Sequence, residues 1–165
     1  MTSTTHDNYL PALGVHQLAE VGQGLQATLV ELLDLVSIGK QLHWNVVRPH
    51  FRPLHLHLDE LVASWRELAD TIAERAVTLG FSPDGQSATV AADSGLAPIK
   101  RGEVDGRVVV RELTRRSADI AERVRARMDR LGELDAVSQD ALIEVVRALE
   151  QQVWMLRTQF ETQRS

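Results

Sequence analysis

Apolar residues recur at spacings of three and four along most of the chain, a periodicity that is typical of amphipathic helices. One representative apolar stripe consists of Leu54, Leu58, Leu61, Trp65, Leu68 and Ile72. Four long segments share this pattern and predict helices over roughly residues 16–46, 51–79, 104–131 and 138–163. The pattern therefore predicts an all-α protein.

Proline and glycine residues mark the boundaries between these helices. Pro49 and Pro53 enclose a short first junction, and Pro53 is tolerated in the opening turn of a helix. Gly80 and Gly132 each follow a helical segment, and we predict that both act as C-caps.

The connection between the second and third helices, residues 80–102, is too long for a simple loop in a compact bundle. We therefore expect a short extra helix near residues 88–92. Four long helices with one extended crossover are typical of a ferritin-like bundle. The length fits a single domain over residues 1–165, with a flexible N-terminal tail over about residues 1–15.

Composition and charge narrow the classes of function. The chain has no cysteine, which excludes disulfides, thiolate metal sites and cysteine nucleophiles. The N-terminal residues resemble no signal peptide, and no stretch reaches 18 uninterrupted apolar residues, so we expect a soluble, cytoplasmic protein without a membrane partner.

The net charge is −5, and Lys40 and Lys100 are the only lysines. Because a lysine-rich arm is missing, direct DNA binding is not expected.

Histidine is concentrated at the first helical junction, where four of the six histidines lie within residues 40–61. Ordinary di-iron bundles hold their metal inside the bundle, with a Glu-x-x-His pair on each of two helices. This sequence contains no such pair and no histidine after His57. The sequence therefore excludes a metal site of that kind.

The second helix instead carries ligand-type residues on its outer face. If His55 defines zero on a helical wheel, Asp59 lies at ~40°, Asp70 at ~60° and Glu74 at ~100°. The apolar stripe is centred at ~260° on the same wheel, so these four side chains point away from the bundle interior.

Axial distance then decides how such residues can share a metal. Asp59 and Asp70 are 11 residues apart, which is ~16 Å along a helix, whereas the two ions of a metal pair lie only ~4 Å apart. Two antiparallel copies, related by a two-fold axis near residues 63–66, would bring His55 and Asp59 of one chain to Asp70 and Glu74 of the other. The small Ala63 suits close helix approach there.

His43 is expected to complete this site, because the turn after it is short enough to return the chain beside His55. Two imidazoles and three carboxylates suit iron, manganese or zinc, and the carboxylates favour the Fe(III) product of an oxidation. Simpler interpretations remain open: Asp70 and Glu74 as a solvated stripe, and His55 with Asp59 as a structural contact.

Other nearby side chains have simpler interpretations of their own. His50 and His57 lie off the stripe and are expected to face solvent or an interface. Trp44 and Trp154 could be ordinary core residues. No single position is decisive, but chance is a poor explanation for all five ligand-type positions occurring together.

The segments KQLHWNV, FRPLHLHLDEL and DTIAERAVTLG together resemble the Dps family, the starvation-induced DNA-protection proteins, which are ferritin-like. The family pattern is specific, because two histidines, two aspartates and a glutamate must follow one another at fixed intervals. The residues that fulfil it without gaps are His43, His55, Asp59, Asp70 and Glu74. The resemblance extends over nearly the whole chain.

The resemblance implies a hollow homo-dodecamer with a ferroxidase site, for two iron ions, at each two-fold interface. Members oxidise Fe(II) with hydrogen peroxide or oxygen and store ferric mineral, which protects DNA from oxidative damage. If the matching positions have the roles they have in the family, His43, Asp70 and Glu74 would hold the more tightly bound iron, with Glu74 as a bridge. His55 and Asp59 would hold the weaker one.

The resemblance also implies roles outside the ligand set. Trp44 would donate electrons beside the site, and Asp140 with Glu144 would line a pore through which iron passes. Asp140 has a simpler interpretation as a carboxylate favoured by the helix dipole. Relatives commonly have Gly-Pro in the first turn, where this chain has Arg48 and Pro49, and a left-handed conformation there would disfavour arginine.

The leading hypothesis is an iron-storage ferroxidase that protects DNA chemically by removing Fe(II) and peroxide. One alternative is a nucleoid-associated, DNA-compacting protein in which iron storage is secondary. A second alternative is a helical bundle that binds zinc or another divalent ion without redox chemistry.

Overall fold

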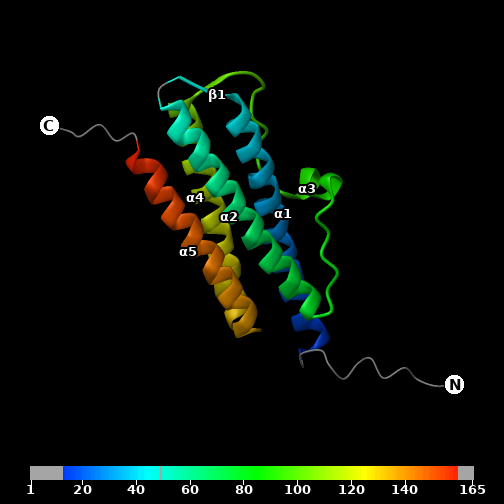
Figure 1. The fold of residues 1–165 in the computed structure, drawn as a ribbon. Coiled ribbons are helices and arrows are strands. Elements are labelled where there is room, and N and C mark those ends of the chain that lie inside the picture. Colours follow the sequence, from blue (N-terminus) through cyan, green and yellow to red (C-terminus); the bar gives the residue numbers. More distant parts are fainter. Residues whose placement is uncertain (1–12, 49, 160–165) are drawn as a thin grey trace.

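The computed structural model describes residues 13–48 and 50–159, and its main feature is a bundle of four long helices (Figure 1). These are α1 (Val15–Asn45), α2 (Phe51–Thr78), α4 (Gly106–Gly132) and α5 (Ala136–Thr158). A short helix, α3 (Ser87–Asp93), lies in the crossover beside α1. The predicted all-α bundle with a short extra helix is confirmed. Most of the predicted flexible tail lies outside the described residues.

Two very short strands join the crossover to the first turn. β1 (Val46–Val47) and β2 (Val104–Asp105) pair in parallel, with Val46 opposite Val104. This pairing holds the start of α4 next to the end of α1. The sequence did not predict these strands, because two residues are too few to display an alternating pattern.

The apolar stripe of α2 forms the centre of the core, as predicted, and Trp65 is completely buried within it. The indole Nε1 of Trp65 donates a hydrogen bond to Oε1 of Gln152 at 2.7 Å, and Nε2 of Gln152 donates to Ser64 Oγ at 3.0 Å. A Cβ at Gly39 would lie 2.6 Å from the Trp65 ring, so glycine allows α1 to approach α2 here. These contacts fix how α1, α2 and α5 pack.

The predicted C-cap at Gly80 is confirmed. Gly80 has a φ of +81°, its N–H donates to Val77 O, and the N–H of Phe81 donates to Ala76 O. This pair of hydrogen bonds is the Schellman arrangement that ends many helices.

The predicted C-cap at Gly132 is wrong. Gly132 is the last residue inside α4, and Glu133 is the C-cap, in a right-handed helical conformation. A Cβ at Gly132 would overlap the side chain of Gln139 at the start of α5. Gly132 therefore has no left-handed backbone to require glycine, and its contact with α5 is with the end of a flexible side chain.

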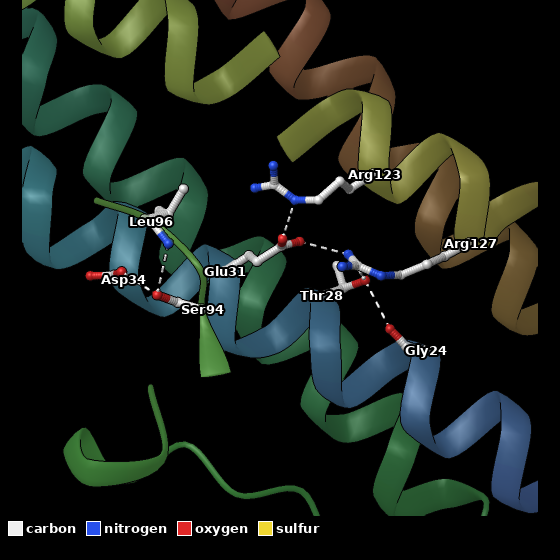
Figure 2. Close-up of polar contacts among 8 residues, drawn as sticks. All are labelled: Gly24, Thr28, Glu31, Asp34, Ser94, Leu96, Arg123 and Arg127. Atoms are coloured by element: carbon white, nitrogen blue, oxygen red, sulfur yellow. Dashed lines mark hydrogen bonds and ion pairs between the residues drawn. The ribbon is translucent and has the colours of Figure 1, made fainter. Parts of the chain in front are cut away.

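A buried charged cluster joins α1 to α4 (Figure 2). Glu31 accepts hydrogen bonds from Arg123 and, at 2.6 Å, from Arg127, while Arg127 also reaches Thr28 Oγ1 at 3.3 Å. Glu31 is almost fully buried, so the two guanidinium groups replace the water that the carboxylate loses. Nearby, Ser94 donates to Asp34 at 2.5 Å and fastens the crossover to α1.

Among the described residues, α1 is the one helix long and apolar enough to cross a membrane by length and composition alone. However, 56% of its most apolar 18-residue window is buried inside the bundle. Its apolar residues therefore have partners in the core, as a central bundle helix requires.

The start of α5 is fixed by a polar cluster that also contacts α2. Asp135 is the N-cap and accepts from the Ser138 N–H at 3.1 Å, while Arg75 on α2 pairs with Asp135 at 2.7 Å and donates to Ser138 Oγ at 3.0 Å. Burial alone would raise the pKa of Asp135, but the hydrogen bonds from Ser138 and Arg75 outweigh it and lower the pKa.

We predict that Asp135→Asn lowers the free energy of unfolding by about 1–2 kcal/mol at pH 7. Because the folded-state pKa of Asp135 is lowered, its contribution is present above the ordinary value of 3.8 and is lost as the pH falls through the folded-state pKa. Urea denaturation of the wild type and of Asp135→Asn, at one protein concentration, measures the difference between their free energies of unfolding. This difference should therefore shrink below about pH 4.

The matched control is Asp105→Asn, which removes the charge of the α4 N-cap but keeps a side-chain oxygen to accept from the Arg107 N–H. No ion pair accompanies that cap in the described part of the chain. The control should therefore cost less stability than Asp135→Asn. A deficit for Asp135→Asn that stays constant from pH 7 to pH 3 would contradict the ion-pair explanation.

Candidate metal centre

The first turn brings the end of α1 beside the start of α2. Arg48 has a φ of 71° and His50 a φ of 63°, so both lie in the left-handed region that reverses the chain direction. Non-glycine residues reach this region at a cost of roughly 1–2 kcal/mol each. Arg48 therefore has the left-handed conformation that was expected to disfavour arginine at this position. Pro49 lies outside the described residues.

His43 and His55 hold each other in place across this turn. Nδ1 of His43 lies 3.0 Å from the backbone oxygen of His55, and Nδ1 of His55 lies 3.0 Å from the backbone oxygen of His43. The two rings stack with centroids 3.6 Å apart. Because a carbonyl oxygen only accepts, both Nδ1 atoms must carry the proton, and both Nε2 lone pairs stay available for a metal.

Asp59 is the third member of this group, which we call the histidine cluster (His43, His55 and Asp59). One ligand atom from each residue lies within 4.8 Å of the others. His43 is 7% exposed, His55 is half-buried and Asp59 is exposed. The cluster therefore has a rigid imidazole side and an open carboxylate side, with too few ligands to enclose an ion.

Lys40, which the sequence analysis did not assign to the site, contacts the cluster directly. Its Nζ donates to Asp59 Oδ1 at 2.8 Å, and the same oxygen lies 3.4 Å from His43 Nδ1. The hydrogen bond from Lys40 is the main cause that holds the pKa of Asp59 below its ordinary value. Asp59 is therefore a carboxylate at neutral pH. The available signal was the position of Lys40, one helical turn before His43.

The acidic pair, Asp70 and Glu74, is not brought to the histidine cluster within one chain. Both residues are exposed on α2, on the outer face that the helical wheel predicted. Asp70 borders a groove of about 320 Å³ between α1, α2 and the crossover. The groove is lined mainly by the apolar side chains of Leu29, Leu33, Ala69, Ala73 and Pro83. A single chain therefore presents two separate sets of candidate ligands.

The simpler interpretation of His55 with Asp59 is not what the structure has. His55 pairs with the backbone of His43, and among the described residues no hydrogen bond or ion pair joins it to Asp59. His50 is exposed, as expected, whereas His57 is half-buried and lies 3.2 Å from Glu60 through its Nδ1.

The interpretation of the two tryptophans as core residues is wrong. Trp44 is 68% exposed and Trp154 is 63% exposed, whereas Trp65 alone fills the core. Trp44 follows His43 on the last turn of α1 and therefore points away from the bundle when His43 points inward. Lys40, which contacts Asp59 of the histidine cluster, has its Nζ 5.9 Å from the centroid of the Trp44 ring.

The pore candidates lie at the opposite end of the bundle. Asp140 and Glu144 are exposed near the start of α5, one helical turn apart on the same side. α5 begins at the end of the bundle far from β1 and the first turn (Figure 1). The histidine cluster and the pore candidates are therefore separate features of the chain.

Comparisons with known proteins agree with this fold. The sequence model of the ferritin-like domain family matches residues 22–165. A protein named DNA protection during starvation protein 2, from Deinococcus radiodurans, is 33% identical over 148 residues, which is 90% of this chain but only 61% of that relative's length. A DNA protection during starvation protein from Mycolicibacterium smegmatis is 34% identical over 98% of this chain and 86% of its own.

Solved structures give the same result at the level of the backbone. DpsA14 from Streptomyces coelicolor superimposes with a TM-score of 0.89 at 30% sequence identity, over 94% of this chain and 92% of that one. Together with the histidine cluster at the first turn of a four-helix bundle, these matches show that the chain belongs to the Dps family of ferritin-like proteins.

Proposed function

We propose that the protein is an iron-storage ferroxidase, whose site is completed when the histidine cluster of one chain meets the acidic pair of another. The observation that carries this proposal is the reciprocal pairing of His43 and His55 beside Asp59. Two imidazoles locked with their Nε2 atoms free, next to an ionised carboxylate, form a preorganised half-site for a divalent ion.

The second half-site comes from the same face of α2. The acidic pair and Asp59 are all exposed on α2, and Asp59 and Asp70 are separated by ~16 Å of helix. A two-fold axis near Ala63, itself exposed, would place each acidic pair opposite the partner's histidine cluster. The contact would produce two equivalent sites per dimer.

The chemistry at such a site follows from its ligands and its two substrates, Fe(II) and hydrogen peroxide. Peroxide takes one electron from each of two Fe(II) ions, its O–O bond breaks, and two protons complete two molecules of water. Because both electrons are available at once, no hydroxyl radical needs to leave the site. The three carboxylates stabilise the Fe(III) product, which is a harder cation than Fe(II). Molecular oxygen is the second oxidant that we propose.

The neighbouring residues have supporting roles in this proposal. Trp44, which is exposed and follows His43, would supply an electron to an oxidant that a pair of Fe(II) ions has not reduced. Asp140 and Glu144 would attract Fe(II) to a pore formed where several chains meet, because clustered carboxylates raise the local concentration of cations. The assembly that we propose is a shell of twelve chains, with ferric mineral stored inside and with DNA protected chemically from oxidative damage.

A second candidate function, nucleic-acid binding, has one observation in its favour. Four exposed cationic side chains occur at and before the start of α4, namely Lys100, Arg101, Arg107 and Arg111. None of these side chains forms an ion pair within residues 13–48 and 50–159. They could contact phosphates without a lysine-rich tail.

We predict that Asp59→Ala combined with Glu74→Ala removes the fast phase of Fe(II) oxidation and leaves slow mineral growth. The double variant lacks one carboxylate from each half-site, so it cannot hold two ions close together. Stopped-flow absorbance after anaerobic Fe(II) loading and peroxide addition measures the fast phase. We expect the rate constant to fall by at least about tenfold, as is typical when metal-binding groups are lost.

The matched control is Glu60→Ala combined with Asp93→Ala, which removes two exposed carboxylates outside both half-sites. This control should keep the wild-type fast phase. An unchanged fast phase in the Asp59 and Glu74 variant would contradict the assignment. A wild-type protein that gives no ferric signal would instead favour the alternative of redox-inactive metal binding.

We also predict weak retention of DNA in a gel-shift titration at moderate salt, because the net charge of the chain is −5. Any retardation at low salt should decrease when Arg107 and Arg111 are both changed to Gln. Tight binding at moderate salt that falls steeply as salt is raised would favour the nucleic-acid function over purely chemical protection.

A further inference from the structure

Cationic side chains collect at the end of the bundle that carries the first turn. Six of them are exposed and form no side-chain hydrogen bond or ion pair within the part of the chain that the structure describes, namely Arg48, Arg52, Lys100, Arg101, Arg107 and Arg111. We call this group the cationic end. The acidic residues in the same stretches, 46–53 and 100–111, are Glu103 and Asp105. Positive charge is therefore in excess at this end.

The short parallel ladder brings these residues together from distant parts of the sequence. Its register pairs Val47 with Asp105. Because the two strands are parallel and lie ~4.8 Å apart, the chain leaves both on the same side, so Arg48 after β1 and the start of α4 after β2 are neighbours. Arg107 and Arg111 follow on α4, one helical turn apart. Figure 1 shows the first turn, the last part of the crossover and the start of α4 at one end of the bundle.

Arg48 is the member of the cationic end whose presence the fold explains least. Its φ of 71° lies in the left-handed region, which glycine reaches freely but which costs an arginine stability. Its exposed side chain makes no hydrogen bond or ion pair to other described residues that would offset this cost. Residues kept in such conformations are frequent at functional sites. A partner outside the chain would give the guanidinium group the contact that the fold does not provide.

We propose that the cationic end binds inorganic phosphate, with Arg48 and Arg107 as its principal ligands. A guanidinium group offers paired N–H donors that match two phosphate oxygens, and such charge-assisted hydrogen bonds are stronger than neutral ones. The other cations raise the local concentration of the anion. The use of the bound ion rests on the proposed storage function: phosphate oxygens are hard ligands that suit Fe(III), so phosphate would be deposited together with ferric iron.

The distribution of charge favours a small anion over a long polyanion. The whole chain has a net charge of −5 although the cationic end is positive, so the rest of the chain is strongly acidic. A phosphate ion contacts the cationic end alone, whereas a DNA duplex extends beyond it and meets the acidic remainder. The far end of the bundle carries the exposed carboxylates of Asp140 and Glu144, which repel phosphate. The two ends of one chain therefore suit ions of opposite charge.

The test is a calorimetric titration of the assembled, iron-free, full-length protein with inorganic phosphate, at low salt and in a buffer without other oxyanions. We expect saturable binding by the wild type. The affinity should fall by about three- to fivefold in Arg48→Gly and in Arg107→Gln, and by about tenfold or more in the double variant, as the loss of exposed ionic contacts allows. Arg48→Lys should bind with intermediate affinity, because lysine keeps the charge but lacks the paired donors.

Two controls separate phosphate binding from other effects. Arg48→Gly relieves the left-handed position, so urea denaturation should show a variant at least as stable as the wild type. Arg147→Gln removes an exposed arginine of α5 that likewise has no partner among the described residues and lies outside the cationic end. This variant should keep the wild-type affinity for phosphate. A duplex oligonucleotide, titrated under the same conditions, forms the second arm of the experiment.

The outcomes are distinct from those that test the ferroxidase. The proposal is overturned if phosphate does not bind saturably, if Arg48→Gly and Arg107→Gln leave its affinity unchanged, or if Arg147→Gln weakens it equally. It is also overturned if the duplex binds through both arginines while phosphate alone does not bind, because the cationic end would then serve nucleic acid. All titrations are made without iron, so failure here leaves the proposed ferroxidase intact. A protein without fast Fe(II) oxidation would lose the use of phosphate in a mineral but keep the binding site.

Discussion

The length of the α-helix imposes the constraint on which the candidate site depends. Each residue advances the chain by ~1.5 Å, so ligands 11 residues apart on one straight helix cannot reach a metal pair whose ions are ~4 Å apart. Asp59 and Asp70 are separated in this way on α2. A site that uses both must combine two chains, and its chemistry is then coupled to association.

The same arrangement lets α2 carry several candidate metal ligands without placing them in the hydrophobic core of the bundle. All ligand candidates of α2 lie on its outer face, so the interior contains an apolar core around Trp65 instead of a metal site. The buried carboxylate of Glu31 has partners of its own, because it accepts from Arg123 and Arg127 (Figure 2). Core packing and the proposed metal binding would therefore use different faces of one helix.

Periodicity predicted the four helices and the outward direction of the acidic pair, because each follows from local spacing alone, whereas the short helix was inferred from the length of the crossover. The meeting of His43 with His55 also followed from the short turn between them. Sequence failed where a second element decides the outcome. The backbone at Gly132 is right-handed because α4 runs on to Glu133, and Trp44 is exposed because its neighbour His43 is the residue that turns inward. The contact of Lys40 with Asp59 joins residues 19 positions apart on two helices, and only the position of Lys40 one turn before His43 indicated it.

The most direct measurement of the central claim is a mixed-chain experiment. One variant lacks His43 and His55, the other lacks Asp70 and Glu74, and each is replaced by alanine. The two chains are assembled separately and together in equal amounts. If the site is shared, each variant alone has no fast Fe(II) oxidation, whereas random mixing restores about one quarter of the wild-type amplitude, because half of the dimers then contain one intact site of two. No recovery in properly assembled mixtures would contradict the shared site.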